Sequence, residues 1–467
     1  MTRFPLQTPP AQPADDRALE TGPCSFLAAP KRAEPRACEV GFLLACAPSC
    51  PDGETGRRIG LKIRREQSLA GSIPAPGTKS NSDEYSSKRT ANFLPMRNDP
   101  TRRRLCAALL GAGAGLALFG ARGGGQPSAR GHSLSDLLKA EHQPGMAAVL
   151  VDRGRVTALA TAGRRNDASD APVDRHTVFE LGSITKVFTA LLVFRLRQRG
   201  LLDVDAPIGR YVDDLPAAWQ PIALSRLLSH TSGVPNYLNE GNFLELMPTD
   251  PTPRELLAMV AQAPLDFAPG TRHAYSNTNY ILLGLAIERV TGADYWQFLQ
   301  DEILGPLKMR DAGPRRAGDR RLIAQGHLYQ EGRWLDPPIT APGSAWAAGG
   351  LLASIDDMAR FAVALDQGKL LPGALLHEMW RDTRLADGGS AGWGAGWELA
   401  DGGQVVGHGG GTAGFTGYLR HVPALRRTVV VLINRAGDIG PQGIAERLDL
   451  GSRSWNGKAS TARRSRA

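Results

Sequence analysis

The sequence predicts an α+β fold for residues 133–450, in which helices flank an antiparallel sheet and a mostly helical subdomain lies between the strands. Two observations predict this fold. Short apolar runs typical of strands lie near both ends of this stretch, whereas apolar residues at helical spacing fill its middle. Because strands at the two ends of a domain bury their apolar faces together, we expect them to build one sheet.

The strands at the two ends have clear sequence signatures. Residues 146–151 and 156–162 are apolar runs joined by an Arg-Gly pair, which predicts a hairpin. Near the other end, residues 428–434 (TVVVLIN) form a β-branched run, and residues 414–422 are expected to be the strand before it. The domain is therefore expected to begin and end in the sheet.

Helical spacing fills the region between these strands. A short helix is expected at residues 135–141, and a buried helix at residues 188–196 continues from the segment around Ser183. The other helices predicted from spacing are residues 222–229, 253–263, 280–291 and 355–365.

Residues 1–95 are rich in Pro, Ser and Arg and show no helix or strand period, so we expect a disordered leader. A basic segment and an apolar run follow, and residues 96–121 have the form of a secretory signal, with a linker up to residue 132. This predicts an exported protein, periplasmic or secreted. Because an export signal normally stands first, we expect Met96 to be the true start. The alternative is a short apolar helix inside a disordered leader.

The net charge of +9 is concentrated outside the predicted domain. Residues 1–132 carry a balance of +8 and residues 452–467 one of +5, whereas residues 133–451 carry −4. We therefore expect residues 451–467 to be a basic disordered tail rather than a nucleic-acid arm. All five cysteines precede residue 107, and the histidines show no metal-binding pattern. No nucleic acid, metal or cofactor is expected.

Ser183 and Lys186 are the first candidate catalytic residues. A step of three residues on a helix places both side chains on one face, one turn apart. A serine hydroxyl needs an adjacent base, and a lysine in an apolar helix is partly desolvated, which lowers its pKa. A serine at a helix start also offers its own N–H to an oxyanion. The alternative is an N-cap serine beside a lysine whose ammonium reaches solvent.

Two further segments carry polar residues in a setting suited to catalysis. Tyr275 and Asn277 lie in a turn before an apolar helix (YSNTNYILLG), so the chain places a phenol and an amide close together. His408 lies at a predicted strand edge and precedes three glycines, whose backbone a substrate can approach closely. The three glycines are Gly409, Gly410 and Gly411.

In order and context, these three segments resemble the S-x-x-K, Y-x-N and H/K-x-G motifs of the serine β-lactamase and DD-peptidase superfamily. The similarity points to its class C branch, which includes family VIII carboxylesterases and D-aminopeptidases. Further family-like segments extend it over about residues 133–450. They are residues 142–149 (HQPGMAAV), 227–235 (LLSHTSGVP), 306–309 (PLKM), 348–361 (AGGLLASIDDMARF) and 394–397 (GAGW).

The resemblance implies a β-lactamase/transpeptidase-like fold and a serine hydrolase that works through an acyl-enzyme. Ser183 would be the acylated nucleophile, and Lys186 would take or hold its proton. Tyr275 would act as general base or acid toward the leaving group, its phenolate character maintained by Lys186. Asn277 would bind the substrate amide or orient Lys186.

The resemblance also implies how substrate would dock. His408, Gly409 and Gly410 would line the docking strand, and the N–H groups of Ser183 and Gly411 would form the oxyanion hole. Penicillin-recognising members usually carry Lys where this chain has His408, and a histidine is only half-charged near pH 6.5. This departure weakens recognition of a substrate carboxylate. It favours a small ester, amide or peptide as substrate over efficient β-lactam hydrolysis.

A second class of function stays open, that of a catalytically silent penicillin-binding-like protein that binds cell-wall peptides or a partner. The joint presence of Ser183, Lys186, Tyr275 and Asn277 favours the enzyme, because a binding protein needs no such set. We expect a small-molecule or peptide substrate, and membrane contact only through an uncleaved leader. The oligomeric state is left open. His230 is expected to be a buried structural histidine at a helix end.

Overall fold

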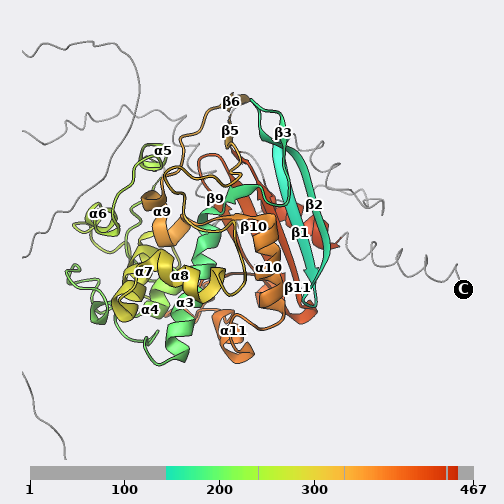
Figure 1. The fold of residues 1–467 in the computed structure, drawn as a ribbon. Helices are drawn as coiled ribbons and strands as arrows, with labels where there is room; N and C mark the ends of the chain where they lie inside the picture. Colours follow the sequence, from blue (N-terminus) through green and yellow to red (C-terminus); the bar gives the residue numbers. More distant parts are fainter. Residues whose placement is uncertain (1–142, 240, 331, 438–439, 451–467) are drawn as a thin grey trace, which may run out of the picture. The chain divides into compact units, whose positions relative to one another are not determined.

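The computed structural model describes residues 143–239, 241–330, 332–437 and 440–450 (Figure 1). The predicted leader, the signal-like segment, the helix at residues 135–141 and the basic tail lie outside the described residues, so these expectations stay predictions. Within the described ranges, no helix is both long and apolar enough to cross a membrane.

The domain is built around a seven-stranded sheet in the order β3-β2-β1-β11-β10-β9-β8. Every neighbouring pair is antiparallel, as predicted. At its centre, β1 (Gly145–Asp152) lies beside β11 (Arg427–Ile433), so the two ends of the domain meet. The other strands are β2 (Arg155–Asn166), β3 (Ala171–Pro172), β8 (Glu398–Ala400), β9 (Val405–Gly411) and β10 (Thr416–Val422).

The predicted hairpin between β1 and β2 is confirmed. Its two turn residues, Arg153 and Gly154, both have positive φ angles, 51° and 72°. A two-residue turn with this backbone matches the right-handed twist of the strands that it joins.

Helices cover both faces of the sheet. Ala147 and Val149 of β1 belong to the large core that includes α3 (Thr185–Gln198) and α10 (Ile355–Asp366). Ala148 and Leu150 of the same strand belong to a second core with the helix at residues 441–450. Because alternate side chains of a strand point to opposite faces, β1 is apolar throughout.

The chain between β4 (Val178–Glu180) and β7 (Leu352–Ser354) forms the predicted helical subdomain, which includes α3, α7 and α8 (Figure 1). Two predicted helices are shorter than expected. The helix predicted at residues 253–263 ends at Ala258, and turns follow it as far as residue 262. The helix predicted at residues 222–229 begins at Leu224 and ends at Leu228, because His230 has a φ of 54°. The remaining elements are η3 (Ile208–Arg210), α4 (Leu224–Leu228), α5 (Phe243–Leu246), α6 (Pro253–Ala258), α7 (Thr278–Thr291), α8 (Tyr295–Leu299), η4 (Gln300–Leu304), α9 (Pro342–Gly349), α11 (Gly373–Met379), η5 (Asp401–Gly403) and η6 (Pro423–Leu425).

Two small sheets were not predicted, because strands of three or four residues show no readable alternation. One pairs β4 (Val178–Glu180) with β7 (Leu352–Ser354), and the other has the order β12-β5-β6. β4 leads directly into η2 (Gly182–Ile184), so its pairing fixes the chain as it reaches Ser183. The second sheet consists of β5 (His327–Gln330), β6 (Arg333–Leu335) and β12 (Arg435–Gly437).

Candidate active site

Ser183 lies in η2, between β4 and the buried helix α3, and this turn is pressed against the end of β9. A Cβ on Gly182, whose φ is +51°, would lie 2.6 Å from the Gly411 nitrogen. A Cβ on Gly410 would lie 2.0 Å from the Leu181 carbonyl oxygen. Both positions therefore require glycine, and the close approach brings the backbone at Ser183 up to Gly411.

Hydrogen bonds to Thr185 and Leu351 also hold this turn. The Thr185 hydroxyl donates to the Gly182 carbonyl oxygen over 2.7 Å and accepts from the Leu351 N–H over 3.1 Å. The Leu181 N–H donates to the Leu351 carbonyl oxygen over 2.9 Å. The backbone that carries Ser183 is therefore fixed both by these hydrogen bonds and by its close packing against β9.

Lys186 is fully buried one turn after Ser183. Its Nζ lies 3.1 Å from Ser183 Oγ, 2.7 Å from Asn277 Oδ1 and 2.6 Å from the Ala348 carbonyl oxygen. Burial lowers the pKa of Lys186 well below its usual value, and no carboxylate among the described residues offsets this effect. A neutral amine has two N–H donors and one lone pair. The two carbonyl oxygens take the donors, which leaves the lone pair for the Ser183 hydroxyl.

Both carbonyl acceptors are held in place. Asn277 donates from its backbone N–H and from Nδ2 to Asn236 Oδ1, over 2.9 and 3.3 Å, so its own Oδ1 faces Lys186. Ala348 lies at the end of α9, where the last carbonyl oxygens of a helix have no partner within the helix. The lysine supplies one such partner.

Tyr275 lies beside the lysine, with its ring centroid 4.8 Å from Lys186 Nζ. Burial of the hydroxyl raises the pKa of Tyr275 above its usual value. The Ser183 side chain partly offsets this rise, although its contact with the Tyr275 hydroxyl lacks the geometry of a full hydrogen bond. The surroundings therefore favour a neutral phenol over the phenolate that the resemblance implies.

His408 is 1% exposed, and its ring centroid lies 6.2 Å from that of Tyr275. Its Nδ1 lies 2.6 Å from the Gly409 carbonyl oxygen, and because a carbonyl only accepts, Nδ1 carries the proton. Burial, with a smaller effect of charge on Lys186, lowers the pKa of His408 to about 3. The imidazole is therefore neutral near pH 7. Its Nε2 is a buried acceptor without a partner among the described residues.

His230, expected to be only structural, holds the segment that carries Tyr275. Its carbonyl oxygen accepts from the Ala274 N–H over 2.9 Å, and its Nδ1 accepts from the Ser276 N–H over 3.1 Å. The imidazole also stacks on the ring of Tyr275, which lies between these two bonded residues in the sequence; the ring centroids are 4.2 Å apart and the planes differ by 29°. Burial first, then nearby positive charge, lowers the pKa of His230 well below its usual value. The ring is thus neutral, as an accepting Nδ1 requires.

Trp393 is a further residue that the sequence analysis missed. Its ring centroid lies 5.5 Å from His408 and 5.9 Å from Tyr275, and it stacks on His273 at 5.1 Å. The surrounding segment (GGSAGWGAGW) shows no helix or strand period, so no pattern marked the tryptophan. Trp393 packs against the two rings that the resemblance places in the site.

The structure brings the predicted residues together. Ser183, Lys186 and Asn277 are joined by hydrogen bonds, and Tyr275 packs on the lysine. The docking strand is β9, whose last residues are His408, Gly409, Gly410 and Gly411. The catalytic roles of these residues stay predictions, since the geometry gives their placement alone.

The fold and this site define a class, α+β proteins that set a buried lysine against a serine beside one strand of an antiparallel sheet. The sequence model of the family described as Beta-lactamase matches residues 132–451, which is more than half of the chain. The chain belongs to this family.

Relatives in this family include enzymes and penicillin-binding proteins. The chain is 33% identical over 325 residues to "Penicillin-binding protein 4" of Amycolatopsis lactamdurans, covering 64% of this chain and 83% of the relative. It is 29% identical over 296 residues to "Esterase EstB" of Burkholderia gladioli, covering 54% and 74%. A solved D-stereospecific amidohydrolase from Streptomyces sp. is 28% identical with a TM-score of 0.56, covering 65% and 94%. These similarities confirm the predicted superfamily and fold, and they support an activity of the serine hydrolase type.

Proposed function

We propose that the protein is a serine acyl hydrolase with Ser183 as nucleophile and neutral Lys186 as base. One observation carries this proposal. Asn277 and Ala348 accept the two N–H bonds of the buried amine, so its lone pair is left for the Ser183 hydroxyl at 3.1 Å. A base placed in this way contributes on the order of 10²–10⁴-fold to rate.

In this proposal one proton is transferred among Ser183, Lys186 and Tyr275 during acylation. Lys186 takes the Ser183 proton as Oγ attacks the substrate carbonyl carbon, and the carbonyl oxygen becomes an oxyanion. The Tyr275 hydroxyl then protonates the leaving group as its bond to carbon breaks, and the lysine ammonium returns a proton to the tyrosine. The raised pKa keeps Tyr275 protonated before this step, so its hydroxyl has a proton to give. Water releases the acyl group by the same steps in reverse.

The oxyanion would be stabilised by the N–H groups of Ser183 and Gly411. The close approach of Gly182 to Gly411 supports this placement, because it brings both backbones to one point. Each donor of such a hole contributes on the order of 10²–10³-fold.

The substrate is proposed to be a small ester or amide without a carboxylate next to His408. A neutral imidazole with a bare Nε2 offers no positive charge and no proton to a carboxylate. An esterase and a D-stereospecific amidohydrolase among the relatives support this substrate class. His408 Nε2 is suited instead to accept a hydrogen bond from an N–H or O–H group of the substrate.

Intact-protein mass spectrometry tests the proposal. The full chain and its Ser183→Ala variant are each exposed to p-nitrophenyl acetate, a D-amino acid amide and benzylpenicillin. We expect an acetyl adduct on the parent protein alone and ester turnover far above penicillin turnover.

Each other outcome changes a defined part of the proposal. If penicillin acylates Ser183 faster than the ester, the substrate class is wrong and the nucleophile stands. If the adduct also forms on Ser183→Ala, the nucleophile is wrong. If no reagent labels the parent protein, a silent binding protein replaces the enzyme.

A further inference from the structure

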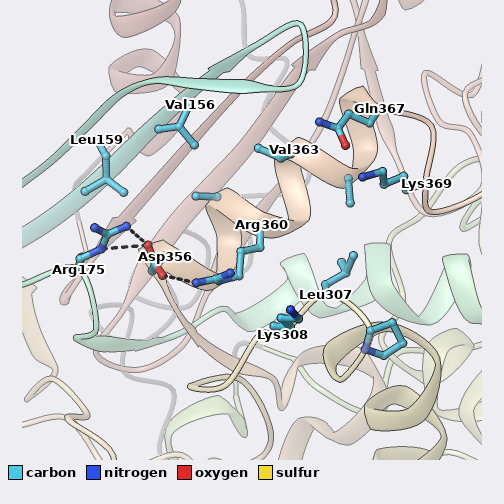
Figure 2. A pocket seen from close by; sticks show the side chains of 13 residues that line it. Val156, Leu159, Arg175, Leu307, Lys308, Asp356, Arg360, Val363, Gln367 and Lys369 are labelled. Carbon is cyan, nitrogen blue, oxygen red and sulfur yellow. Dashed lines mark hydrogen bonds and ion pairs between the residues drawn. The ribbon is translucent and has the colours of Figure 1, made fainter.

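A groove of about 710 Å³ runs along α10, and none of its lining residues belongs to the candidate active site (Figure 2). We call it the α10 groove. Its walls are α10, part of β2 and the turn at residues 306–308. Ligand pockets in proteins typically enclose about 300–1,000 Å³, so this groove has the size of a small-molecule site.

The floor of the α10 groove is apolar. Ala359, Val363 and Ala364 follow helical spacing and line it from α10, while Leu159 and Leu307 line it from the other walls. The valine and both leucines are only partly buried. All three pack against the large core, so the hollow exposes an apolar edge of that core, which an apolar group of a ligand can cover.

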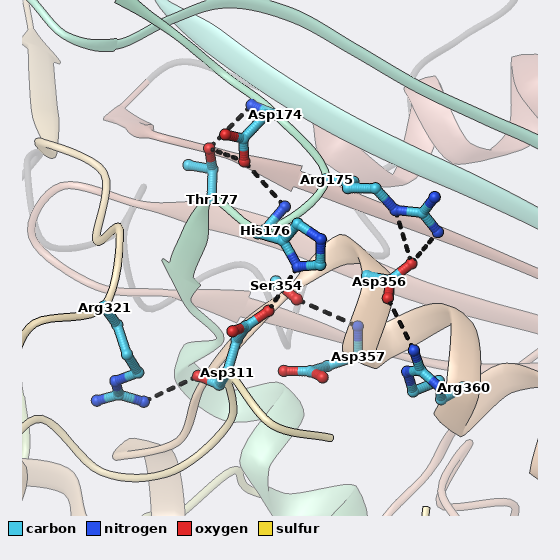
Figure 3. Close-up of polar contacts among 10 residues, drawn as sticks. All are labelled: Asp174, Arg175, His176, Thr177, Asp311, Arg321, Ser354, Asp356, Asp357 and Arg360. Carbon is cyan, nitrogen blue, oxygen red and sulfur yellow. Dashed lines mark hydrogen bonds and ion pairs between the residues drawn. The ribbon is translucent and has the colours of Figure 1, made fainter. Parts of the chain in front are cut away.

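Two arginines at the groove are oriented by one carboxylate. Figure 3 shows the guanidinium groups of Arg175 and Arg360 reaching Asp356 from two sides. Arg175 Nε lies 3.0 Å from Asp356 Oδ1, and an Arg360 nitrogen lies 3.2 Å from Oδ2. The carboxylate is 10% exposed, whereas the arginines are 58% and 46% exposed. The pair therefore presents fixed cations to solvent and hides the anion.

Two lysines extend this positive charge. Lys308 and Lys369 are exposed at the groove, and neither ammonium has an ion pair or hydrogen bond among the described residues. The lining thus holds four cations and a single carboxylate, in a domain whose own balance over residues 133–451 is −4. Positive charge gathered in a hollow attracts and concentrates anions.

We propose that the α10 groove binds a single-chain anionic amphiphile from solution. The apolar chain lies on Val363 and Leu307, and the carboxylate or phosphate head lies among Lys308, Arg360 and Lys369. An apolar floor with cations at its edge matches both parts of such a molecule. A concave groove encloses one chain, whereas a bilayer surface is met by protruding apolar side chains, so the free amphiphile is the occupant.

Titration calorimetry with the full-length Ser183→Ala variant tests the proposal, using decyl phosphate below its micelle concentration. We expect one bound molecule per chain, and octyl phosphate should bind more weakly by up to about fourfold for each methylene removed. Decyltrimethylammonium should not bind. The proposal is overturned if decyl phosphate does not bind, or if the cationic amphiphile binds equally well.

Charge reversals locate the site. The pair Lys308→Glu and Lys369→Glu should weaken decyl phosphate binding at least about tenfold, since both proposed head-group contacts become repulsive. The pair Arg320→Glu and Arg333→Glu changes net charge equally at exposed positions outside the lining and serves as the matched control. Equal weakening by both pairs, or no weakening by the lysine pair, would place the amphiphile elsewhere and reject the groove. Tight binding of a polyglutamate peptide without amphiphile binding would reject the proposed ligand class.

Discussion

Lysine side chains have opposite surroundings in the candidate active site and in the α10 groove. Lys186 is fully buried, its pKa is lowered by burial, and two carbonyl oxygens take its N–H bonds. Lys308 and Lys369 are exposed and have no acceptor among the described residues. In the proposed mechanism Lys186 therefore offers a lone pair, whereas the two lysines of the α10 groove offer a positive charge. Solvent access, rather than residue identity, decides which chemistry a lysine supports.

Two adjacent aspartates beside the groove repeat this contrast (Figure 3). Burial acts to raise the pKa of Asp356, but Arg175 and Arg360 outweigh it and hold the pKa below its usual value. Asp357 has no such partners, and burial together with the charge of Asp311 raises its pKa to about 7. These two neighbouring carboxyl groups therefore differ in protonation state between about pH 4 and pH 7.

Replacing Lys186 by methionine should have the largest effect on activity, and replacing Lys308 by methionine almost none. Loss of the base should lower kcat for p-nitrophenyl acetate on the order of 10²–10⁴-fold, whereas Lys308→Met should leave it within about twofold. Steady-state kinetics, with circular dichroism to check folding, make the measurement. A Lys186→Met variant with full activity would remove the lysine from the mechanism.

The pH dependence of kcat/KM should report the same buried amine. The reacting form is the neutral amine, so kcat/KM should rise about tenfold per pH unit below the lowered pKa of Lys186 and then level off. The plateau should begin well below pH 10. His408 should add no step near pH 6.5, because its pKa is about 3. A rise that continues above pH 10 would mean that the lysine is charged in the free enzyme.

His230→Phe should separate positioning from folding. Phenylalanine keeps a ring beside Tyr275 but cannot accept from the Ser276 N–H. We expect a loss of roughly tenfold with an anilide or alkyl ester, which need a proton from Tyr275, and a smaller loss with a p-nitrophenyl ester. His421→Phe is the matched control, because His421 is also buried but bonds to Thr428. If activity falls equally with both kinds of leaving group, His230 stabilises the fold and does not position Tyr275 for proton transfer.

Asp357→Asn should give the smallest effect, on stability. The folded-state pKa of about 7 lies above the unfolded value, so the folded chain keeps a proton that the unfolded chain releases, and stability falls as pH rises from about 4 to 7. Asparagine does not titrate. The free energy of unfolding of the variant should therefore exceed that of the parent by about 1–2 kcal/mol at pH 8, and the two values should be nearly equal at pH 4. Urea unfolding at the two pH values measures this, and a gain larger at pH 4 would contradict the sign.

The fold was predictable where burial leaves a period in the sequence. The central strands, the buried helix α3 and the hairpin at Arg153 were all read correctly, because side-chain direction and turn chemistry are local. The three-stranded sheet of β5, β6 and β12 was not, since its parallel pairing of residues 435–437 with residues 327–329 depends on contacts distant in sequence.

The candidate site divides in the same way. The step from Ser183 to Lys186 is local, and helix geometry alone placed the two side chains together. The meeting of Lys186 with Asn277 required the family resemblance or the structure, and the contact of Lys186 with Ala348 came from the structure alone. The roles of His230 and Trp393 were out of reach, because they arise from ring contacts made across the fold. The pKa directions, which turn Tyr275 into a phenol and His408 into an acceptor, depend on burial that no sequence pattern reports.

The pairing of β1 with β11 also sets the order in which the domain can be made. Met146 lies opposite Ile433, so a ribosome completes the strand at one side of the sheet's centre long before it completes the neighbour. Until then β1 can pair only with β2, and contacts between such distant segments form slowly. A growing chain must therefore carry an unfinished, apolar strand edge from the completion of β1 at Asp152 until the completion of β11 at Ile433. That interval is when chaperones and proteases have the most access to it.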